Sequence, residues 1–270
     1  MTKFKDKVVL ITGGTSGIGR IMGRMALERG ARQLIVWGTS QLKIDDTIAE
    51  FRAKGYHVEG CSVDVSDAKA VEMAYKNIRD KHGAVDILIN NAGVVTSNRT
   101  FDNYSIAEID RTMDVNSKAP MYVALSVLRD MVERNAGHIC NIASAAGMIA
   151  NPRMSVYVAS KWAVIGWSES MRIELKQRRS KVHVTTVAPY YINTGMFDGV
   201  KSPILPILEP EATARKIIRA IERNRDFKGI PLGFHLIRLA QGLLPTSWFE
   251  FIFGRCFGIF STMDNFKGRK

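Results

Sequence analysis

The amino-acid sequence predicts an α/β fold, a doubly wound parallel sheet within a single domain. Short apolar runs alternate with longer helical segments over the first 190 residues, which is typical of repeated strand–helix–strand units. The apolar runs are nearly continuous, as expected for strands that helices cover on both faces. At 270 residues and 30.1 kDa, the chain is long enough to bury one large core.

The expected strands and helices follow one another in a regular order. Strands are expected at the short runs of Val, Ile and Leu, at 7–12, 34–37, 57–63, 87–90, 138–143 and 182–188. Helices are expected in the segments between them, at 18–29, in a segment ending at 54, and at 68–82, 106–133 and 155–177. In such a sheet, a ligand is expected at the carboxyl edge of the strands.

The net charge of +12 raises the question of anionic partners. The basic residues are scattered, however, and the one short run, Lys176-Gln177-Arg178-Arg179, lies where a helix is expected to end. Cations at that position interact favourably with the helix dipole. The run is therefore interpreted as a solvated helix end, and no nucleic-acid partner is predicted.

The cysteines and histidines indicate neither disulfides nor a metal site. Cys61, Cys140 and Cys256 lie far apart, and the two in apolar runs are expected to be buried, reduced thiols. The five histidines show no metal-like spacing. Neither a signal peptide nor an apolar run long enough to span a bilayer is found, so a cytoplasmic location is expected.

A glycine-rich stretch, Thr12-Gly13-Gly14-Thr15-Ser16-Gly17-Ile18-Gly19, follows the first expected strand and opens the first helix. A turn without side chains lets the backbone approach a pyrophosphate, and the helix N-terminus offers free N–H groups. This context predicts a Rossmann-type dinucleotide site. Its expected contacts are Gly13, Thr15, Ser16, Gly17, Ile18 and Gly19.

The end of the second strand bears on which dinucleotide is bound. A carboxylate there would bind the ribose hydroxyls and repel a 2′-phosphate. This chain has Gly38, Thr39 and Ser40 instead, which favours NADP(H), although no arginine is present to hold the phosphate and NAD remains the alternative. Further cofactor contacts are expected after the third and fourth strands, at Asp64, Val65, Asn91, Ala92 and Gly93.

Tyr157 and Lys161 share one helix face, and Ser144 follows the preceding strand. The pKa of a free tyrosine is near 10, and a neighbouring ammonium is expected to lower it by favouring the phenolate. Ser144 can hydrogen-bond a substrate oxygen beside the phenol. Together with the dinucleotide site, these groups predict the interconversion of an alcohol and its carbonyl, with Tyr157 as the general acid/base.

In these motifs the chain resembles the short-chain dehydrogenase/reductase family, over roughly residues 5–225. The resemblance implies that Asn116 completes a catalytic group with Ser144, Tyr157 and Lys161, bends its helix and holds a water that links Lys161 to solvent. It also implies cofactor contacts from Pro189, Ile192, Thr194, Tyr157 and Lys161. Tyr190 stands where the family has a glycine after Pro189.

The stretches 193–197 and 261–266 are similar to the subgroup that contains retinol dehydrogenases and 17β-hydroxysteroid dehydrogenases. An N-terminal hydrophobic anchor, frequent in that subgroup, is not found here. The glycine-rich final strand of the wider family is replaced by residues 227–232, expected to form a shortened version. Pairing of relatives through the helices at 106–133 and 155–177 implies a homodimer or homotetramer.

The last 60 residues differ in pattern from the rest. Pro203, Pro206 and Pro210 mark a loop before a helix expected at 211–223, and 230–260 is apolar but interrupted by Gly, Pro and charged residues. We expect residues 1–225 to form the dinucleotide-binding and catalytic domain. Residues 226–270 are expected to be a helical extension of it that covers substrate, contacts another subunit or lies on a membrane surface.

The residues expected beside Tyr157 and Ser144 predict a lipophilic substrate, a steroid, retinoid or long-chain alcohol. Thioethers and aromatic rings suit such a molecule, and here they are Met148, Met154, Tyr190, Met196 and Phe197. Three alternatives remain open. They are a non-catalytic dinucleotide-binding sensor or scaffold, a reductase for a small polar or acyl carbonyl substrate, and an epimerase or dehydratase.

Overall fold

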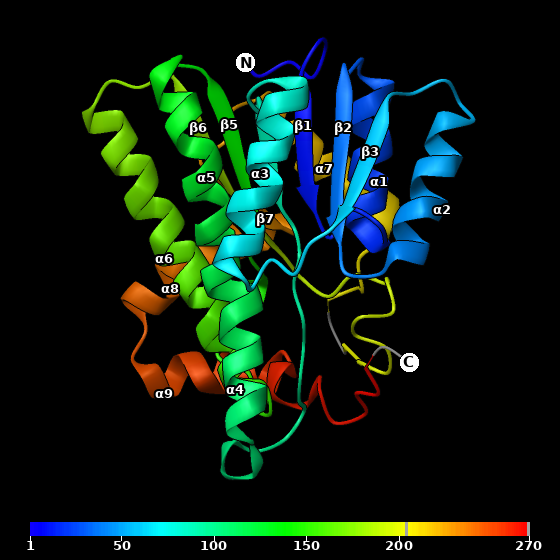
Figure 1. Cartoon of the computed structure of the whole chain (residues 1–270). Helices are drawn as coiled ribbons and strands as arrows, with labels where there is room; N and C mark the ends of the chain where they lie inside the picture. Colours follow the sequence, from blue (N-terminus) through cyan, green and yellow to red (C-terminus); the bar gives the residue numbers. More distant parts are fainter. Residues whose placement is uncertain (203–204, 269–270) are drawn as a thin grey trace.

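In the computed structural model, the described residues, 1–202 and 205–268, form a seven-stranded parallel sheet (Figure 1). Pro203, expected in a loop, lies outside the described residues. The strand order is β3-β2-β1-β4-β5-β6-β7, so the order reverses between β1 and β4. A parallel sheet opens a crevice at such a reversal. The strands are β1 Val8–Thr12, β2 Gln33–Gly38, β3 Val58–Ser62, β4 Ile87–Asn90, β5 Gly137–Ile142, β6 Val182–Pro189 and β7 Phe227–Ile230.

Helices cover both faces of the sheet, as the sequence predicts. Buried side chains of α1, α2 and α7 belong to one apolar core, and those of α3 and α5 belong to a second core on the other face. The long helix α6 contributes to both. The helices are α1 Gly17–Glu28, α2 Gln41–Arg52, α3 Ala68–His82, α4 Ile106–Met113, α5 Ala119–Glu133, α6 Ser155–Gln177, α7 Pro210–Glu222, α8 Ile237–Leu243 and α9 Thr246–Phe249.

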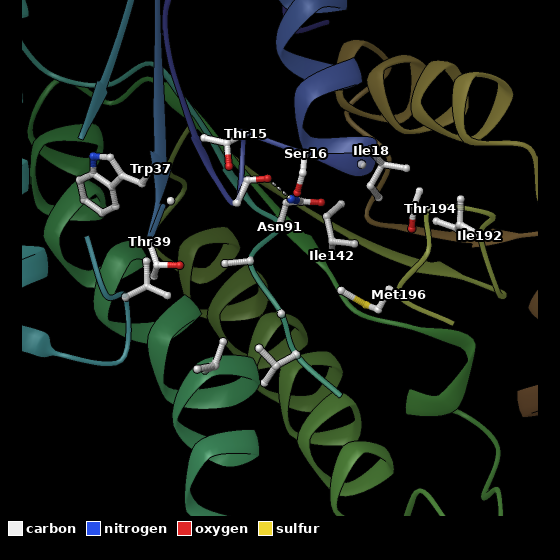
Figure 2. A pocket seen from close by; sticks show the side chains of 18 of the residues that line it. Thr15, Ser16, Ile18, Trp37, Thr39, Asn91, Ile142, Ile192, Thr194 and Met196 are labelled. Atoms are coloured by element: carbon white, nitrogen blue, oxygen red, sulfur yellow. Dashed lines mark hydrogen bonds between the residues drawn. The ribbon is translucent and has the colours of Figure 1, made fainter. Parts of the chain in front are cut away.

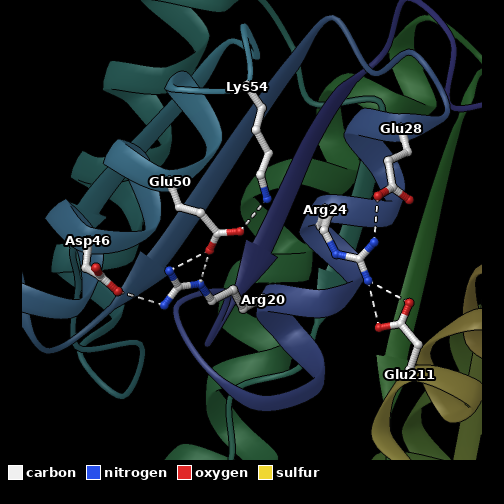
Figure 3. A network of polar contacts seen from close by, with 7 residues as sticks. All are labelled: Arg20, Arg24, Glu28, Asp46, Glu50, Lys54 and Glu211. Carbon is white, nitrogen blue, oxygen red and sulfur yellow. Dashed lines mark hydrogen bonds and ion pairs between the residues drawn. The ribbon is translucent and has the colours of Figure 1, made fainter.

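An ion network fixes the glycine-turn helix α1 to its neighbours (Figure 3). Arg20 bonds Asp46 at 2.9 Å and Glu50 at 2.7 Å, both on α2. Arg24 bonds both carboxylate oxygens of Glu211 on α7, at 2.6 and 2.7 Å. Hydrogen bonds between arginine and carboxylate groups are directional. These pairs therefore set the orientation of α1 more than they add to stability, since each is partly exposed.

The single helix expected at 106–133 is not continuous. A π-helical turn, Asp114–Lys118, separates α4 from α5. Asn116 lies in this turn, where its fully buried side chain bonds the backbone of Val94 instead of facing solvent. A widened turn re-aims a side chain without ending the helix. The bend implied by the family resemblance is therefore present.

Cys61 contradicts the expectation that both strand cysteines are buried. Cys140, in the inner strand β5, is buried, whereas Cys61, in β3, is exposed. The reason is position in the sheet, because β3 is an edge strand and its last residues lie at the margin of the helical cover. Residues 227–232, expected to form a short final strand, do pair with β6 through β7.

The C-terminal extension, orange to red in Figure 1, crosses the end of the molecule at the carboxyl edge of the strands. Arg238 on α8 pairs with Glu169 on α6 at 2.6 Å, and Gln241 donates to the Met148 carbonyl oxygen at 2.6 Å. Farther on, Asn98 donates to the Met263 carbonyl oxygen at 2.9 Å. Within the described part of the chain, no helix combines the length and apolar character needed to cross a bilayer.

Candidate active site

The glycine turn between β1 and α1 forms one wall of a cavity of about 310 Å³ at the reversal of strand order (Figure 2). Gly13 and Gly17 have positive φ angles of 64° and 52°, which favour glycine. A Cβ on Gly19 would collide with the Gly13 carbonyl oxygen. No side chain caps the first turn of α1, so its N–H groups face the cavity unblocked.

Asn91 and Thr12 lock this turn against the end of β4. The Thr12 hydroxyl oxygen accepts from the backbone N–H groups of Asn91 and Ala92, at 3.0 and 3.1 Å. In return, the Asn91 amide donates to the carbonyl oxygens of Thr12 and Gly13, each at 3.1 Å. The turn is thus held open by bonds between two strands that meet at the switch point.

Most of the residues predicted for the site line this one cavity. They are Gly13, Thr15, Ser16, Gly17, Ile18, Gly38, Thr39, Ser40, Asp64, Val65, Asn91, Ala92, Gly93, Ser144, Tyr157, Lys161, Pro189, Tyr190, Ile192, Thr194, Met196 and Phe197. Gly19 and Asn116 lie behind the wall, where they shape the turn and contact Val94. Met154 lines a smaller adjoining cavity instead.

Met148 was expected beside Tyr157, but it lines neither cavity. Its side chain is buried in the apolar core, and its carbonyl oxygen accepts from Gln241. The short helical turn Ala145–Gly147 after Ser144 carries the next residue inward. Met148 therefore lies behind the two cavities in this structure, and its contact with substrate stays a prediction.

Sequence reasoning missed several residues at the end of the cavity formed by β2 and β3. Trp37, Lys43, Val63 and Arg111 all line it. Arg111 Nη1 lies 3.1 Å from Asp64 Oδ2. Burial opposes ionisation of Asp64, but hydrogen bonds from Ser66 and Arg111 outweigh it and hold the pKa of the carboxyl below its usual range. Arg111 lies on α4, 47 residues from Asp64 in the sequence, so no local sequence pattern indicates that the two side chains meet.

The Ser144, Tyr157 and Lys161 side chains meet where β5 faces α6. Ser144 follows β5, while Tyr157 and Lys161 occupy the first turns of α6. The Ser144 and Tyr157 side chains line the same two adjoining cavities. Lys161 Nζ lies 5.7 Å from the centre of the Tyr157 ring and donates to the Ile142 carbonyl oxygen at 3.1 Å. The three groups therefore meet in one place, where Tyr157 and Lys161 are buried and Ser144 is half-buried.

Asn116 stands next to this unit. Its amide oxygen accepts from the Val94 N–H at 2.8 Å, and its amide nitrogen donates to the Ser160 hydroxyl at 3.2 Å. A Cβ on Gly93 would lie 3.3 Å from Asn116 Oδ1 and 3.6 Å from Lys161 Nζ. The glycine thus lets the backbone pass between the asparagine and the lysine.

Burial dominates the acidities in this unit. It raises the pKa of Tyr157 to about 12, although the hydrogen bond with Ser144 partly offsets it. It lowers the pKa of Lys161 to about 8. Burial, and not the neighbouring ammonium, is therefore the larger influence on the pKa of Tyr157 in this structure. Both groups lose hydration, and the ammonium bonds a carbonyl oxygen and not the phenol.

Aromatic rings form the wall next to Tyr157. The Phe197 ring packs edge-on against Tyr157 at 5.8 Å between centres and against Tyr191 at 5.0 Å. Tyr190, which replaces the family glycine, packs against Tyr191 at 4.7 Å and Phe234 at 5.6 Å. Its hydroxyl lies 3.1 Å from that of Ser202. The substitution therefore adds aromatic surface on the side of the site facing the C-terminal extension.

Comparison with known proteins agrees with this geometry. Residues 7–204 match the model of the short chain dehydrogenase family. The chain is 35% identical to epidermal retinol dehydrogenase 2 of Mus musculus, covering 98% of this chain and 86% of that protein. It is 30% identical to estradiol 17-beta-dehydrogenase 11 of Pongo abelii, covering 88% of this chain and 79% of that protein.

Two solved structures have the same fold. A short-chain dehydrogenase/reductase from Burkholderia phymatum in complex with NAD is 25% identical, with a TM-score of 0.77 over 90% of this chain and 95% of that one. A metagenomic short-chain oxidoreductase in complex with NADP is 28% identical, with a TM-score of 0.72 over 85% of this chain and 97% of that one.

The chain belongs to the short-chain dehydrogenase family. Within it, the chain falls in the subgroup of the retinol and 17β-hydroxysteroid dehydrogenases. It is an oxidoreductase of the NAD(P)-dependent alcohol dehydrogenase type.

Replacing Lys161 with Met tests the burial of the ammonium. Because the folded-state pKa is depressed to about 8, the desolvation penalty is fully present at pH 7 and disappears as the pH rises from about 8 to 10.5. We expect Lys161→Met to raise the free energy of unfolding at pH 7 by about 1–3 kcal/mol, and by less at pH 10. Urea unfolding at both pH values measures this.

Lys176→Met, at the exposed end of the same helix, is the control and should change neither value by more than about 0.5 kcal/mol. A Lys161→Met variant that is less stable than the wild type at pH 7 contradicts the buried, strained ammonium.

Proposed function

We propose that this protein interconverts a lipophilic alcohol and its carbonyl, with NADP(H) as the cofactor and Tyr157 as the general acid/base. The observation that carries the proposal is that Ser144 and the buried Tyr157 and Lys161 share one cavity with the glycine turn. A phenol, an ammonium and a dinucleotide cradle in one cavity fit alcohol–carbonyl chemistry.

The residues of the cradle fit a nicotinamide dinucleotide. The glycines leave room for a pyrophosphate, and the uncapped N-terminus of α1 faces the same space. Ile192 and Thr194, from the segment after β6, line the side of the cavity away from Trp37 and Thr39 and would hold the nicotinamide (Figure 2). When bound, the cofactor accepts or supplies the hydride of the reaction.

Tyr157 handles the proton in either direction. In oxidation, the Tyr157 oxygen takes the proton of the substrate hydroxyl, and the hydrogen on the carbinol carbon leaves as a hydride to the cofactor. In reduction, its O–H returns the proton to the carbonyl oxygen. A phenol with a raised pKa is protonated at neutral pH and is therefore ready for reduction. For oxidation, Lys161 must stabilise the phenolate, and Ser144 fixes the substrate oxygen.

The preference for NADP(H) gains support from Lys43. The end of β2 has no carboxylate to repel a 2′-phosphate, and Thr39 and Ser40 offer hydroxyl groups there. Lys43, in the first turn of α2, lines the same cavity as these residues. It supplies a cation for the 2′-phosphate in place of the arginine that is absent from the end of β2. A lysine in this position binds a phosphate as a point charge.

The substrate side of the site is apolar. Met154, Met196 and Phe197 line it together with Tyr190 and Tyr191, and residues of the C-terminal extension cover it. Two of the relatives, epidermal retinol dehydrogenase 2 and estradiol 17-beta-dehydrogenase 11, are named for lipophilic substrates. This wall and these relatives support a steroid, retinoid or long-chain alcohol.

Two exposed apolar surfaces support larger assemblies. The paired helices α5 and α6 expose Leu125, Val132, Trp162 and Ile173, which suits a contact between copies of this chain in a homodimer or homotetramer. The C-terminal extension exposes a second set. It consists of Leu232, Leu236, Leu239, Leu243, Trp248 and Phe251.

For the second surface we propose contact with an anionic lipid membrane. Its leucines and aromatics are accompanied by the exposed cation Arg255, and the whole chain carries a net charge of +12. Apolar side chains with positive charge favour an anionic bilayer surface. The same extension supplies Phe234 and Ile259 to the substrate side, so a lipophilic substrate would have a short route from the bilayer.

Tyr157→Phe tests the acid/base assignment. Removing the phenol oxygen leaves no group to exchange the substrate proton, so we expect kcat to fall at least 100-fold. The dissociation constant of NADPH should change less than about twofold, because the ring is retained. Turnover is followed at the nicotinamide absorbance, and binding by fluorescence. Tyr122→Phe, on α5, is the control. Undiminished turnover by Tyr157→Phe would refute the assignment.

Lys43→Ala tests the cofactor preference. We expect the dissociation constant of NADPH to rise about fivefold while that of NADH stays unchanged, because only NADPH carries the 2′-phosphate. Fluorescence titration of the full chain measures both constants. The control is Lys54→Ala, just beyond the far end of α2. Equal weakening of both dinucleotides, or tighter wild-type binding of NADH than of NADPH, contradicts the proposal.

Leu239→Glu together with Leu243→Glu tests the lipid contact. Sedimentation with phosphatidylserine-containing vesicles should retain the wild-type chain and release most of the double variant, because two exposed apolar side chains of the proposed lipid-contact surface become charged. A matched control is Leu42→Glu, at an exposed leucine on α2. Absence of wild-type binding contradicts the contact, as does a double variant that binds equally well.

A further inference from the structure

A polar cluster lies within the apolar substrate side of the site. The Asn151 amide nitrogen donates to the Tyr191 hydroxyl at 2.9 Å and to the Thr262 hydroxyl at 3.0 Å. The two hydroxyls lie 3.1 Å apart, and Thr262 also donates to the Ile259 carbonyl oxygen at 2.9 Å. The cluster therefore joins the loop after β5, the segment after β6 and the C-terminal extension.

The amide oxygen of Asn151 is the exception in this cluster. Both N–H groups of the side chain are used, but Oδ1 is buried and has no hydrogen-bond partner among the described residues. The side chain is only 8% exposed. A buried acceptor without a donor is rare in proteins, because its lost hydration is not replaced.

Asn151 lines the smaller cavity, which also contains Ser144 and Tyr157. The remaining wall is apolar or aromatic, including Met154, Phe197 and Ile149, and no charged side chain lines it. The free oxygen thus belongs to the same space as the reacting group, in surroundings that suit a neutral donor. A hydroxyl fits these surroundings, whereas an ammonium would lose its hydration without a counter-charge.

We propose that Asn151 is a specificity residue whose Oδ1 accepts a hydrogen bond from a second hydroxyl of the substrate, remote from the reacting carbon. The inference rests on the proposed function and narrows its substrate class. The substrate is an apolar molecule with oxygen at two places, a carbinol or carbonyl that meets Tyr157 and a hydroxyl that meets Asn151. An unsubstituted hydrocarbon tail leaves the acceptor unpaired and is disfavoured.

The cavity around Asn151 is small, about 30 Å³, which is enough for a water molecule but not for a ring system. Part of its wall, Phe234 and Ile259, comes from the C-terminal extension. The loops after β5 and β6 and the start of α6 form the rest of the wall. A substrate therefore enters by displacing these two side chains, and its far hydroxyl reaches the loop residue Asn151, which is anchored from the other side by Tyr191.

Equilibrium binding of a matched pair of ketones tests the proposal. The probes are estrone, which carries a hydroxyl at the end remote from its carbonyl, and 3-deoxyestrone, which lacks only that hydroxyl. Titration calorimetry uses the full chain with NADP⁺, which cannot reduce a ketone. We expect the wild type to bind estrone ten- to a hundredfold more tightly, as is typical of a hydrogen bond to a buried acceptor.

Two variants separate the acceptor from the packing around it. Asn151→Leu removes Oδ1 and should bind both ketones with equal dissociation constants. Thr262→Val removes an internal partner of the same amide but leaves Oδ1, and should preserve the wild-type ratio. Thermal unfolding of each variant verifies that it is folded.

The possible results discriminate between the two proposals. If the wild type binds the two ketones equally, the Asn151 assignment is overturned; this is the result expected if a water satisfies Oδ1. Binding of neither ketone also overturns it. A binding ratio that persists in Asn151→Leu also overturns it. If the ratio depends on Asn151 but NADPH reduces neither ketone, the specificity residue stands and the proposed reaction fails.

Discussion

Removal of water from Tyr157 and Lys161 is the constraint on which the site depends. Both side chains are buried, and this burial raises the pKa of the phenol and lowers that of the ammonium. A dry site strengthens every remaining electrostatic contact, so small displacements of the lysine change the acidity of the tyrosine strongly. The fold must therefore hold the lysine firmly. It does so through the Ile142 carbonyl oxygen, and Gly93 leaves room beside Nζ and Asn116 Oδ1.

This requirement explains the irregular turn between α4 and α5. A regular helix over 106–133 would present Asn116 at a different angle, and the bonds from its amide to Val94 and Ser160 would be lost. The π-helical turn departs from regular helix geometry at one place. This departure lets Asn116 connect the segment after β4 with α6. Asn91 plays the corresponding part at the glycine turn. In both cases an asparagine side chain bonds main-chain groups of a neighbouring segment, which fixes loops that the parallel sheet alone does not position.

Much of the fold was accessible from sequence because its signals are local. The apolar runs that became β1, β4 and β5 and the helical segment that became α6 each have their own pattern, and the glycine turn has a spacing set by the pyrophosphate it accommodates. Contacts between distant segments were not accessible. Arg111 reaches Asp64 across 47 positions, and Thr262 reaches Asn151 across 111, so neither has a local signature.

The departures from expectation have the same origin. Met148 was expected in the cleft beside Tyr157, but the short turn after Ser144 directs it into the core. Cys61 was judged by its apolar neighbours, although exposure depends on the strand's position at the sheet edge. The pKa of Tyr157 was reasoned from one neighbour, whereas burial by many residues decides it. Each of these properties is set by the assembled fold, and composition near the residue does not report it.

The C-terminal extension has two apolar faces with different tasks. Its inner face supplies Phe234, Ile259 and Thr262 to the substrate side and is tied to the body of the protein by Arg238 and Gln241. Its outer face carries exposed leucines and aromatics that the body of the protein leaves uncovered. A segment that only closed the pocket would need the inner set alone. Apolar residues on both faces therefore fit the proposed membrane contact, in which a lipophilic substrate would pass from the bilayer to the inner face as the side chains over Asn151 move aside.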